Sequence, residues 1–134
     1  MKDIEIIVID AVYRALQAQY PGIPVSSDIS ITPERFPCVF IEQSDSFTST
    51  NRRNSEKTDN FDISVFDVNV YSNKPQGKRE EAKAIMSIID DELRLMGMTR
   101  SSLEIVSIPN PVRARLFARY ECEVGPENVI YQRR

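Results

Sequence analysis

The 134-residue sequence contains no histidine, no tryptophan, two cysteines and four glycines. The missing histidine removes the commonest general base and metal ligand, and with them the usual hydrolase triad. So few glycines leave little room for a phosphate-binding loop or a dinucleotide-binding turn, and neither motif is present. No run approaches the roughly eighteen apolar residues of a membrane-spanning helix. We therefore predict a protein that is not an enzyme, with no catalytic, cofactor-binding or metal-binding residues.

Charge and cysteine content narrow the class further. The formal net charge is −3 and the pI is about 5.1. Proteins that bind the nucleic-acid backbone usually present a basic face, so this charge argues against such a protein. The first residues mix Asp3, Glu5 and Asp10 among apolar residues, so we expect no signal peptide and a cytosolic protein. There Cys38 and Cys122 are expected to be reduced and buried, rather than disulfide-bonded or reactive.

Hydrophobic periodicity predicts two helices. Residues 2–19 place apolar side chains at three- and four-residue spacing, and the following YPGIP segment ends the pattern. Residues 78–96 repeat this spacing and stop at Gly97, a typical helix end. The predicted buried faces are Ile4, Ile7, Val8, Ala11, Val12, Ala15 and Leu16 in the first helix, and Ala82, Ile85, Met86, Ile89, Leu93 and Met96 in the second.

Period-two patterns predict a mostly antiparallel sheet, with strands at 36–43, 60–73, 101–108 and 112–124 and a short strand or extended segment at 25–35. In the strand at 60–73 the parity changes between Val65 and Phe66, which indicates a β-bulge or a strand apolar on both sides. The strand at 112–124 alternates most clearly, as a half-buried strand does. The element order predicts a single α+β domain over 1–134, with both helices on one sheet face.

A polar segment between two of these strands is too long for an ordinary hairpin turn, which takes two to five residues. It covers residues 44–60 and has balanced charges that include Arg52, Arg53 and Lys57. A segment with so little to bury is expected to be mobile. It is either a passive loop or an arm that orders against a partner protein. Residues 125–134 form a predicted C-terminal tail, either docked through its apolar VIY triplet or free.

Acidic residues offer weak candidate sites. Asp90 and Asp91 are successive helix residues separated by about 100°, so they do not converge on one ion and are expected on a solvated face. Asp59 and Asp62, near a strand start, could form a carboxylate pair, but no second group of residues accompanies them.

Arginines on the polar side of the last strand are the most suggestive feature. Arg113, Arg115 and Arg119, with Arg100 nearby, either pair with glutamates on neighbouring strands and cover the sheet with their stems, or form a subunit interface. Phe117 lies among them, and an aromatic residue on a wet sheet face favours a covered surface. Both interpretations remain open.

Several segments in a fixed order carry a resemblance to a known family. An amphipathic helix leads into the strand FPCVFIEQ, followed by a long polar loop and the strand FDVNVYSN. The helix EAKAIMSIIDDELRLMGMTR and the strand ARLFARYECEV complete the run. Over roughly residues 4–124 this order resembles the tail terminator proteins of long-tailed bacteriophages, also called tail completion or minor tail proteins.

The resemblance implies a structural virion protein without cofactors, assembled in the host cytoplasm and located at the head-proximal end of the tail, with no membrane contact. Members of the family form a ring, typically a hexamer, that stops polymerisation of the major tail tube protein and offers a docking surface to the head–tail connector. DNA passes through the lumen without specific binding. In such a ring the expected subunit or tube interface comprises Arg52, Arg53, Lys57, Arg113, Arg115, Phe117 and Arg119.

Other functions remain open. One is a related ring-forming neck protein that joins head to tail or stops leakage between them. Another is a small cytosolic α+β dimer that binds a metabolite, with the polar loop as a lid over an apolar pocket. A third is an enzyme that uses only carboxylates and arginines.

Overall fold

The protein is described by a computed structural model that covers residues 4–27, 36–48, 62–106, 113–125 and 130. These residues contain two helices and five strands, so the α+β prediction is confirmed. In chain order the elements are α1 (Glu5–Gln17), β1 (Val25–Ser26), β2 (Cys38–Thr48), β3 (Asp62–Ser72), α2 (Lys78–Leu95), β4 (Thr99–Val106) and β5 (Ala114–Val124).

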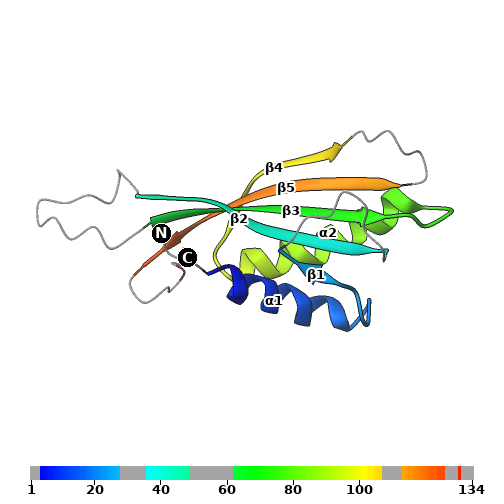
Figure 1. Ribbon diagram of the computed structural model, residues 1–134, viewed down its shortest axis with the longest axis horizontal. Helices are drawn as coiled ribbons and strands as arrows, with labels where there is room; N and C mark the ends of the chain where they lie inside the picture. The colour runs from blue at the N-terminus through cyan, green and yellow to red at the C-terminus, as the bar shows by residue number, and fades with distance from the viewer. Residues whose placement is uncertain (1–3, 28–35, 49–61, 107–112, 126–129, 131–134) are drawn as a thin grey trace, which may run out of the picture.

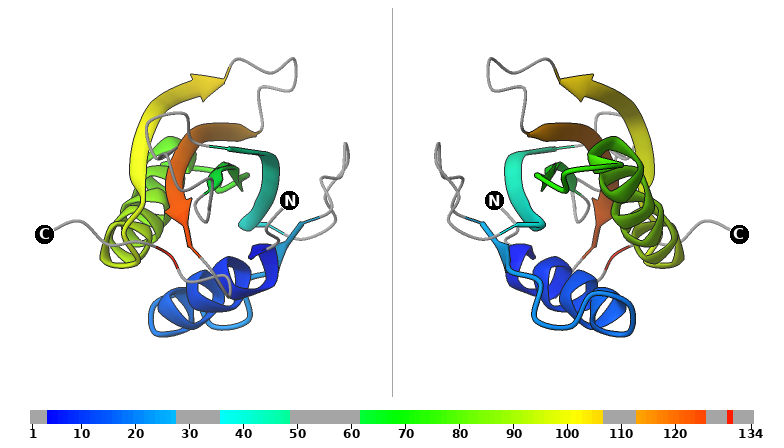
Figure 2. Two further views of the ribbon diagram at one scale, coloured as in Figure 1. Left: turned by 90° about the vertical axis from the view of Figure 1, so that its left-hand side faces the viewer. Right: turned by 90° about the vertical axis from the view of Figure 1, so that its right-hand side faces the viewer.

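The strands form one sheet in the order β1-β2-β3-β5-β4. All neighbouring pairs are antiparallel except that of β1 with β2, which is parallel. Figure 1 shows both helices on the same side of the sheet, and in Figure 2 the sheet curls over them. The prediction of two helices on one face is therefore confirmed. We call the helix-covered side the inner face and the opposite side the outer face.

The inner face of β3 and β5 forms the centre of the core. Phe66 lies opposite Tyr120, and Val68 lies opposite Ala118, and all four side chains are fully buried. Every second residue of β5, from Ala114 onward, is buried, so the alternation predicted for this strand is confirmed where the structure describes it. In β3 most outward-facing residues are buried as well, so this strand is covered on both sides.

The helices bury most of their predicted faces. α1 buries Val8, Val12 and Leu16, and α2 buries all of its predicted positions except Met96, which is partly buried beyond its last turn. The prediction was wrong for Ile7, whose side chain is half exposed. α1 turns toward the core the side that carries Ile4 and Val8, and Ile7 lies beside this buried side. The alanines of α1 are partly buried.

α2 ends as its sequence predicts. Gly97 adopts a left-handed conformation with φ of 97°. The Gly97 N–H donates to the Arg94 carbonyl and the Met98 N–H to the Leu93 carbonyl, at 3.0 and 2.9 Å. These are the two hydrogen bonds of a Schellman motif, and the buried Met98 and Leu93 supply its hydrophobic contact.

Strands β2 and β4 each contain a one-residue bulge occupied by serine. In β2 the register shifts at Ser44, opposite Val65 and Phe66, and in β4 it shifts at Ser101. The Ser44 hydroxyl donates to the Val65 carbonyl at 3.3 Å, and the Ser101 hydroxyl donates to the Arg119 carbonyl at 3.2 Å. The parity change in β3 thus marks a bulge, but the extra residue belongs to its neighbour β2.

Several boundaries differ from those predicted. β2 continues through Ser44–Thr48, because the bulge lets it keep pairing with β3, so the predicted arm at 44–60 begins as a strand, and residues 49–61 lie outside the described part. β4 begins two residues before the predicted strand, and the last two predicted residues, 107–108, lie outside the described part. Of the C-terminal tail, Ile130 bridges to Val124 and packs on the core. No described helix is long and apolar enough to cross a membrane.

Candidate functional site

The arginines on the outer face of β5 are engaged by residues of the same chain. The Arg119 Nε donates to Asp67 Oδ1 on β3 at 2.8 Å. Two N–H groups of Arg115 donate to Asn69 Oδ1, at 2.9 and 2.7 Å. Cross-strand pairing therefore holds for both arginines, with Asp67 and Asn69 on β3 as partners instead of glutamates.

Arginines of the outer face also cover aromatic rings. The guanidinium carbon of Arg113 lies 4.9 Å from the centre of the Phe36 ring, and that of Arg115 lies 5.6 Å from the Tyr71 ring. Tyr71 meets Phe40 edge to face at 5.7 Å. With Cys38, these side chains make a small second cluster of buried residues on the outer face. The outer face is therefore a layer of aromatic groups capped by cations, a stabilising arrangement.

Phe117 lies on the same outer face, in β5. Its cross-strand neighbours are Asn69 on β3 and Glu104 on β4, and the Arg119 guanidinium carbon is 5.7 Å from its ring centre. Its side chain is partly buried. The structure thus places four of the predicted interface residues on one face, and the other three lie outside the described residues: Arg113, Arg115, Phe117 and Arg119 in the first group, and Arg52, Arg53 and Lys57 in the second.

Arg100 does not belong to this set. The bulge at Ser101 reverses the parity of β4, so Arg100 pairs with Tyr120 and shares the inner face with Leu103 and Ile105. Sequence alternation alone could not locate this reversal, because no residue in the TRSSLEIV segment of β4 identifies the extra position.

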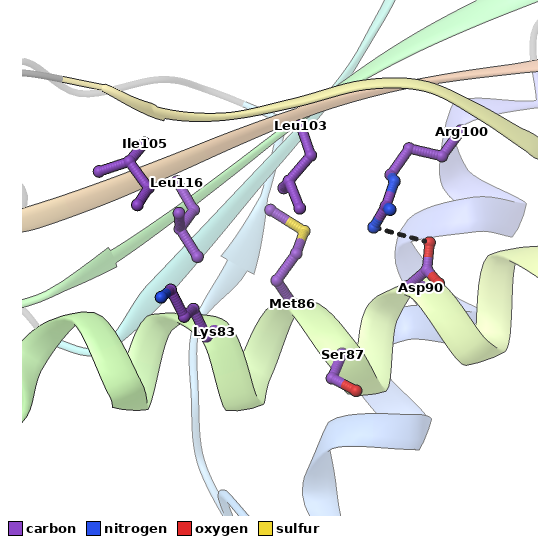
Figure 3. A pocket seen from close by; sticks show the side chains of 8 residues that line it. All are labelled: Lys83, Met86, Ser87, Asp90, Arg100, Leu103, Ile105 and Leu116. Atoms are coloured by element: carbon purple, nitrogen blue, oxygen red, sulfur yellow. Dashed lines mark ion pairs between the residues drawn. The ribbon is translucent and has the colours of Figure 1, made fainter.

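A groove of about 520 Å³, which the sequence pattern does not predict, opens between α2 and β4. Met86 of α2 points toward Leu103 of β4, and the Arg100–Asp90 ion pair lies toward one end of the groove (Figure 3). Leu103 and Ile105 are 46% and 48% exposed, so the wall that β4 contributes is apolar and open. The lining residues are Lys83, Met86, Ser87, Asp90, Arg100, Leu103, Ile105 and Leu116.

Asp90 is the acidic residue in the lining of this groove, and it makes several polar contacts. The Tyr120 hydroxyl donates to its Oδ1 at 2.7 Å, Arg94 Nε donates to its Oδ2 at 2.7 Å, and Arg100 Nη1 lies 3.6 Å from Oδ1. Burial raises the pKa of Asp90, but the bonds from Tyr120 and Arg94 and the two positive charges more than offset this, so its pKa lies below the usual value.

The expectation of a solvated face was therefore wrong for Asp90, because Tyr120 reaches it from β5 through the core. It holds for Asp91, which is exposed.

The two cysteines do not form a disulfide. Cys38 and Cys122 are free and buried, as predicted. Burial raises the pKa of Cys122 to about 12, and it raises that of Cys38 to about 11 although the charge of Arg113 partly opposes this. Within the described residues no group of three or more His, Cys, Asp or Glu side chains could hold a metal ion. Asp62 is partly exposed, and Asp59, its predicted carboxylate partner, lies outside the described residues.

Comparison with protein-family models and with curated protein sequences finds no match for this chain.

Proposed function

We propose that this protein is a structural component of a phage virion that caps the head-proximal end of the tail tube as a ring. It stops growth of the tube and provides the docking surface for the head–tail connector. The proposal rests on the resemblance in segment order and on one structural observation, the reach of the β2–β3 hairpin beyond the helix layer.

The hairpin geometry supports an arm that contacts another subunit or the tube. The Ile4 N–H at the start of α1 donates to Gln43 Oε1, at 3.1 Å. The β2–β3 pairing continues five residues further, to Thr48 opposite Asp62. Figure 1 shows this end of the hairpin extending past both helices. A strand pair whose end reaches past the helices in this way suits assembly with another protein surface.

The outer face supplies a second contact surface in this proposal. Arg115 and Arg119 make polar contacts inside the chain, and Arg113 covers the Phe36 ring. Phe117 is therefore the residue best suited to bury new area against a tube or neighbouring subunit. An aromatic residue within a layer of arginines matches the composition of interface centres. The major tail tube protein and the head–tail connector are the proposed partners, with DNA passing through the lumen without specific binding.

A test of the ring uses the purified full chain. Light scattering should give the mass of a closed oligomer, six subunits in the proposal, and negative-stain images should show rings, alone or on tail tubes of the same phage. Added during tube assembly, the protein should shorten the tubes. A protein that stays monomeric and leaves tube length unchanged would contradict the proposal.

A variant localises the contact made by the outer face. Phe117→Ala should weaken capping of tail tubes at least tenfold, since a buried interface aromatic typically contributes about 2 kcal/mol or more. Gln19→Ala, at an exposed position beyond the end of α1, is the control and should cap tubes like the parent. Parent-like capping by Phe117→Ala, or loss of its fold, would remove this residue from the interface.

The groove between α2 and β4 favours a second candidate, a small α+β protein that binds a ligand. Its volume of about 520 Å³ lies in the range of small-molecule sites, which are mostly apolar with a few polar groups. A thermal-shift screen with apolar carboxylates should give a clear increase in Tm if this alternative holds, and Lys83→Met should abolish the increase.

A further inference from the structure

The exposed apolar side chains gather on two separate surfaces. Among the described residues six large hydrophobic side chains are exposed. Ile6, Ile7 and Tyr13 belong to α1, and Leu103 and Ile105 line the groove between α2 and β4. Leu95, the last residue of α2, does not line this groove. Single exposed hydrophobic residues are ordinary, but two grouped sets on different elements indicate surfaces that meet something.

The α1 surface has the pattern of a helix that enters a groove. Ile6, Asp10 and Tyr13 are spaced at i, i+4 and i+7, so they form one stripe along the helix. Ile6 is 81% exposed, although Val8 two positions later is fully buried. Asp10, in the middle of this stripe, forms an ion pair with Arg14 of the same helix. We call this stripe the α1 ridge.

The α2–β4 groove matches the α1 ridge in length and charge. Along α2 it extends from Lys83 to Asp90, seven residues or about 10 Å, the same rise as from Ile6 to Tyr13. Its apolar walls are Met86, Leu103, Ile105 and Leu116. Lys83 is exposed and has no ion-pair partner among the residues described. A carboxylate in the middle of the ridge would complement it.

The two surfaces of one chain cannot meet each other. α1 packs against α2 and the β1–β2 side of the sheet. β4 forms the opposite edge, and Figure 2 shows β4 and α1 on different sides of the molecule. A ridge on one side and a groove on another give a contact between two different surfaces of identical chains. Such heterologous contacts close into rings or continue as filaments.

We infer that the junction between neighbouring subunits is the α1 ridge of one copy seated in the α2–β4 groove of the next, an inference that rests on the proposed ring. Ile6 and Tyr13 enter between Met86 and the β4 side chains, and Asp10 approaches Lys83. The outer face, with Phe117, then remains available for the tube.

Two variants with a mixing experiment test this junction. Ile6→Asp impairs the ridge and Ile105→Asp impairs the groove, both at positions about half exposed or more. Each variant alone should lose self-association at least tenfold in analytical ultracentrifugation while keeping its circular dichroism spectrum. Mixed in equal amounts, they should form a complex of two subunits and no larger species, because each pair retains one intact ridge and one intact groove.

Controls separate failure of this junction from failure of the proposed function. Ser102→Asp places the same charge on the outer face of β4 and should leave the ring intact. If Ile105→Asp unfolds, Lys83→Glu replaces it, and its loss of association should be restored by Asp10→Lys. A parent ring that survives both Ile6→Asp and the groove variants overturns the junction alone. A mixture that stays monomeric does the same, since it excludes a ridge–groove contact. A parent that never associates overturns both proposals.

Discussion

At the scale of the residue, Asp90 shows how a charged side chain can join three elements. Its carboxylate receives a hydrogen bond from Tyr120 of β5 and one from Arg94 of α2, and it lies beside Arg100 of β4. Tyr120 is fully buried, so its hydroxyl needs a partner, and Asp90 supplies one at the edge of the core. The contribution of Asp90 to stability therefore comes mainly from the hydroxyl bond and less from the exposed Arg94.

Asp90→Asn should lower the free energy of unfolding by about 1–2 kcal/mol at pH 7, because bonds to a charged acceptor are stronger than those to an amide. The pKa of Asp90 is depressed in the folded state, so this stabilisation is present above the unfolded pKa of about 4 and is lost as the pH falls through the lower folded value. The difference between parent and variant should thus shrink below about pH 4.

Urea unfolding between pH 3 and 8 measures this difference. Asp91→Asn is the matched control, since Asp91 is the exposed neighbour on the same helix, and it should change stability by less than about 0.5 kcal/mol. Equal effects of the two substitutions, or a difference that grows at low pH, would contradict the role assigned to Asp90.

At the scale of the element, the attachment of α1 to the sheet depends on one buried polar side chain. Gln43 accepts the Ile4 N–H, and its amide donates to Ser64 Oγ at 3.3 Å. The Gln43 backbone N–H donates to Glu5 Oε2 at 2.9 Å. No side chain caps the start of α1, so Gln43 supplies across the interface what a capping residue normally supplies locally.

Gln43→Leu should destabilise the fold by about 1–3 kcal/mol, because it leaves the Ile4 N–H and the Ser64 hydroxyl buried without this partner. The first turn of α1 should exchange its amide hydrogens faster than in the parent, which hydrogen–deuterium exchange of the corresponding peptides measures. Gln19→Leu is the control with the same substitution at an exposed position and should leave both quantities nearly unchanged. Unchanged exchange in the first turn would show that α1 is held by its apolar face alone.

At the scale of the whole molecule, the sequence predicts the main layers because their periodicity reflects burial directly. β5 and α2 alternate as a half-buried strand and an amphipathic helix should, and both were placed correctly. The sequence could not predict where one extra residue enters a strand, since Ser44 and Ser101 resemble any polar strand residue. The extra residue at Ser101 places Arg100 on the inner face, so the sequence pattern did not predict the groove beside α2.

Two hydrophobic clusters of unequal size predict unequal local stability. Cys122 belongs to the large inner core, whereas Cys38 belongs to the small outer cluster with Phe40 and Tyr71. Both thiols should react slowly with a bulky thiol reagent at pH 8, because burial keeps their pKa values at about 12 and about 11. Cys38 should react several-fold faster than Cys122, since a small cluster opens more readily than a whole core.

The single-thiol variants Cys38→Ala and Cys122→Ala assign each rate, with protein unfolded in urea giving the fully accessible limit. Equal rates would indicate that the two clusters open together. Immediate reaction of either thiol in the native protein would contradict its burial.

The two serine bulges also affect how the edges of the sheet can associate with other strands. Over most of its length β2 has one unoccupied side among the described residues, as does β4 throughout, and such edges invite stacking into amyloid-like aggregates. The extra residue in each strand interrupts the row of backbone donors and acceptors partway along, so an incoming strand cannot pair in register along the whole edge. Edge-to-edge association of two copies through these strands is therefore disfavoured.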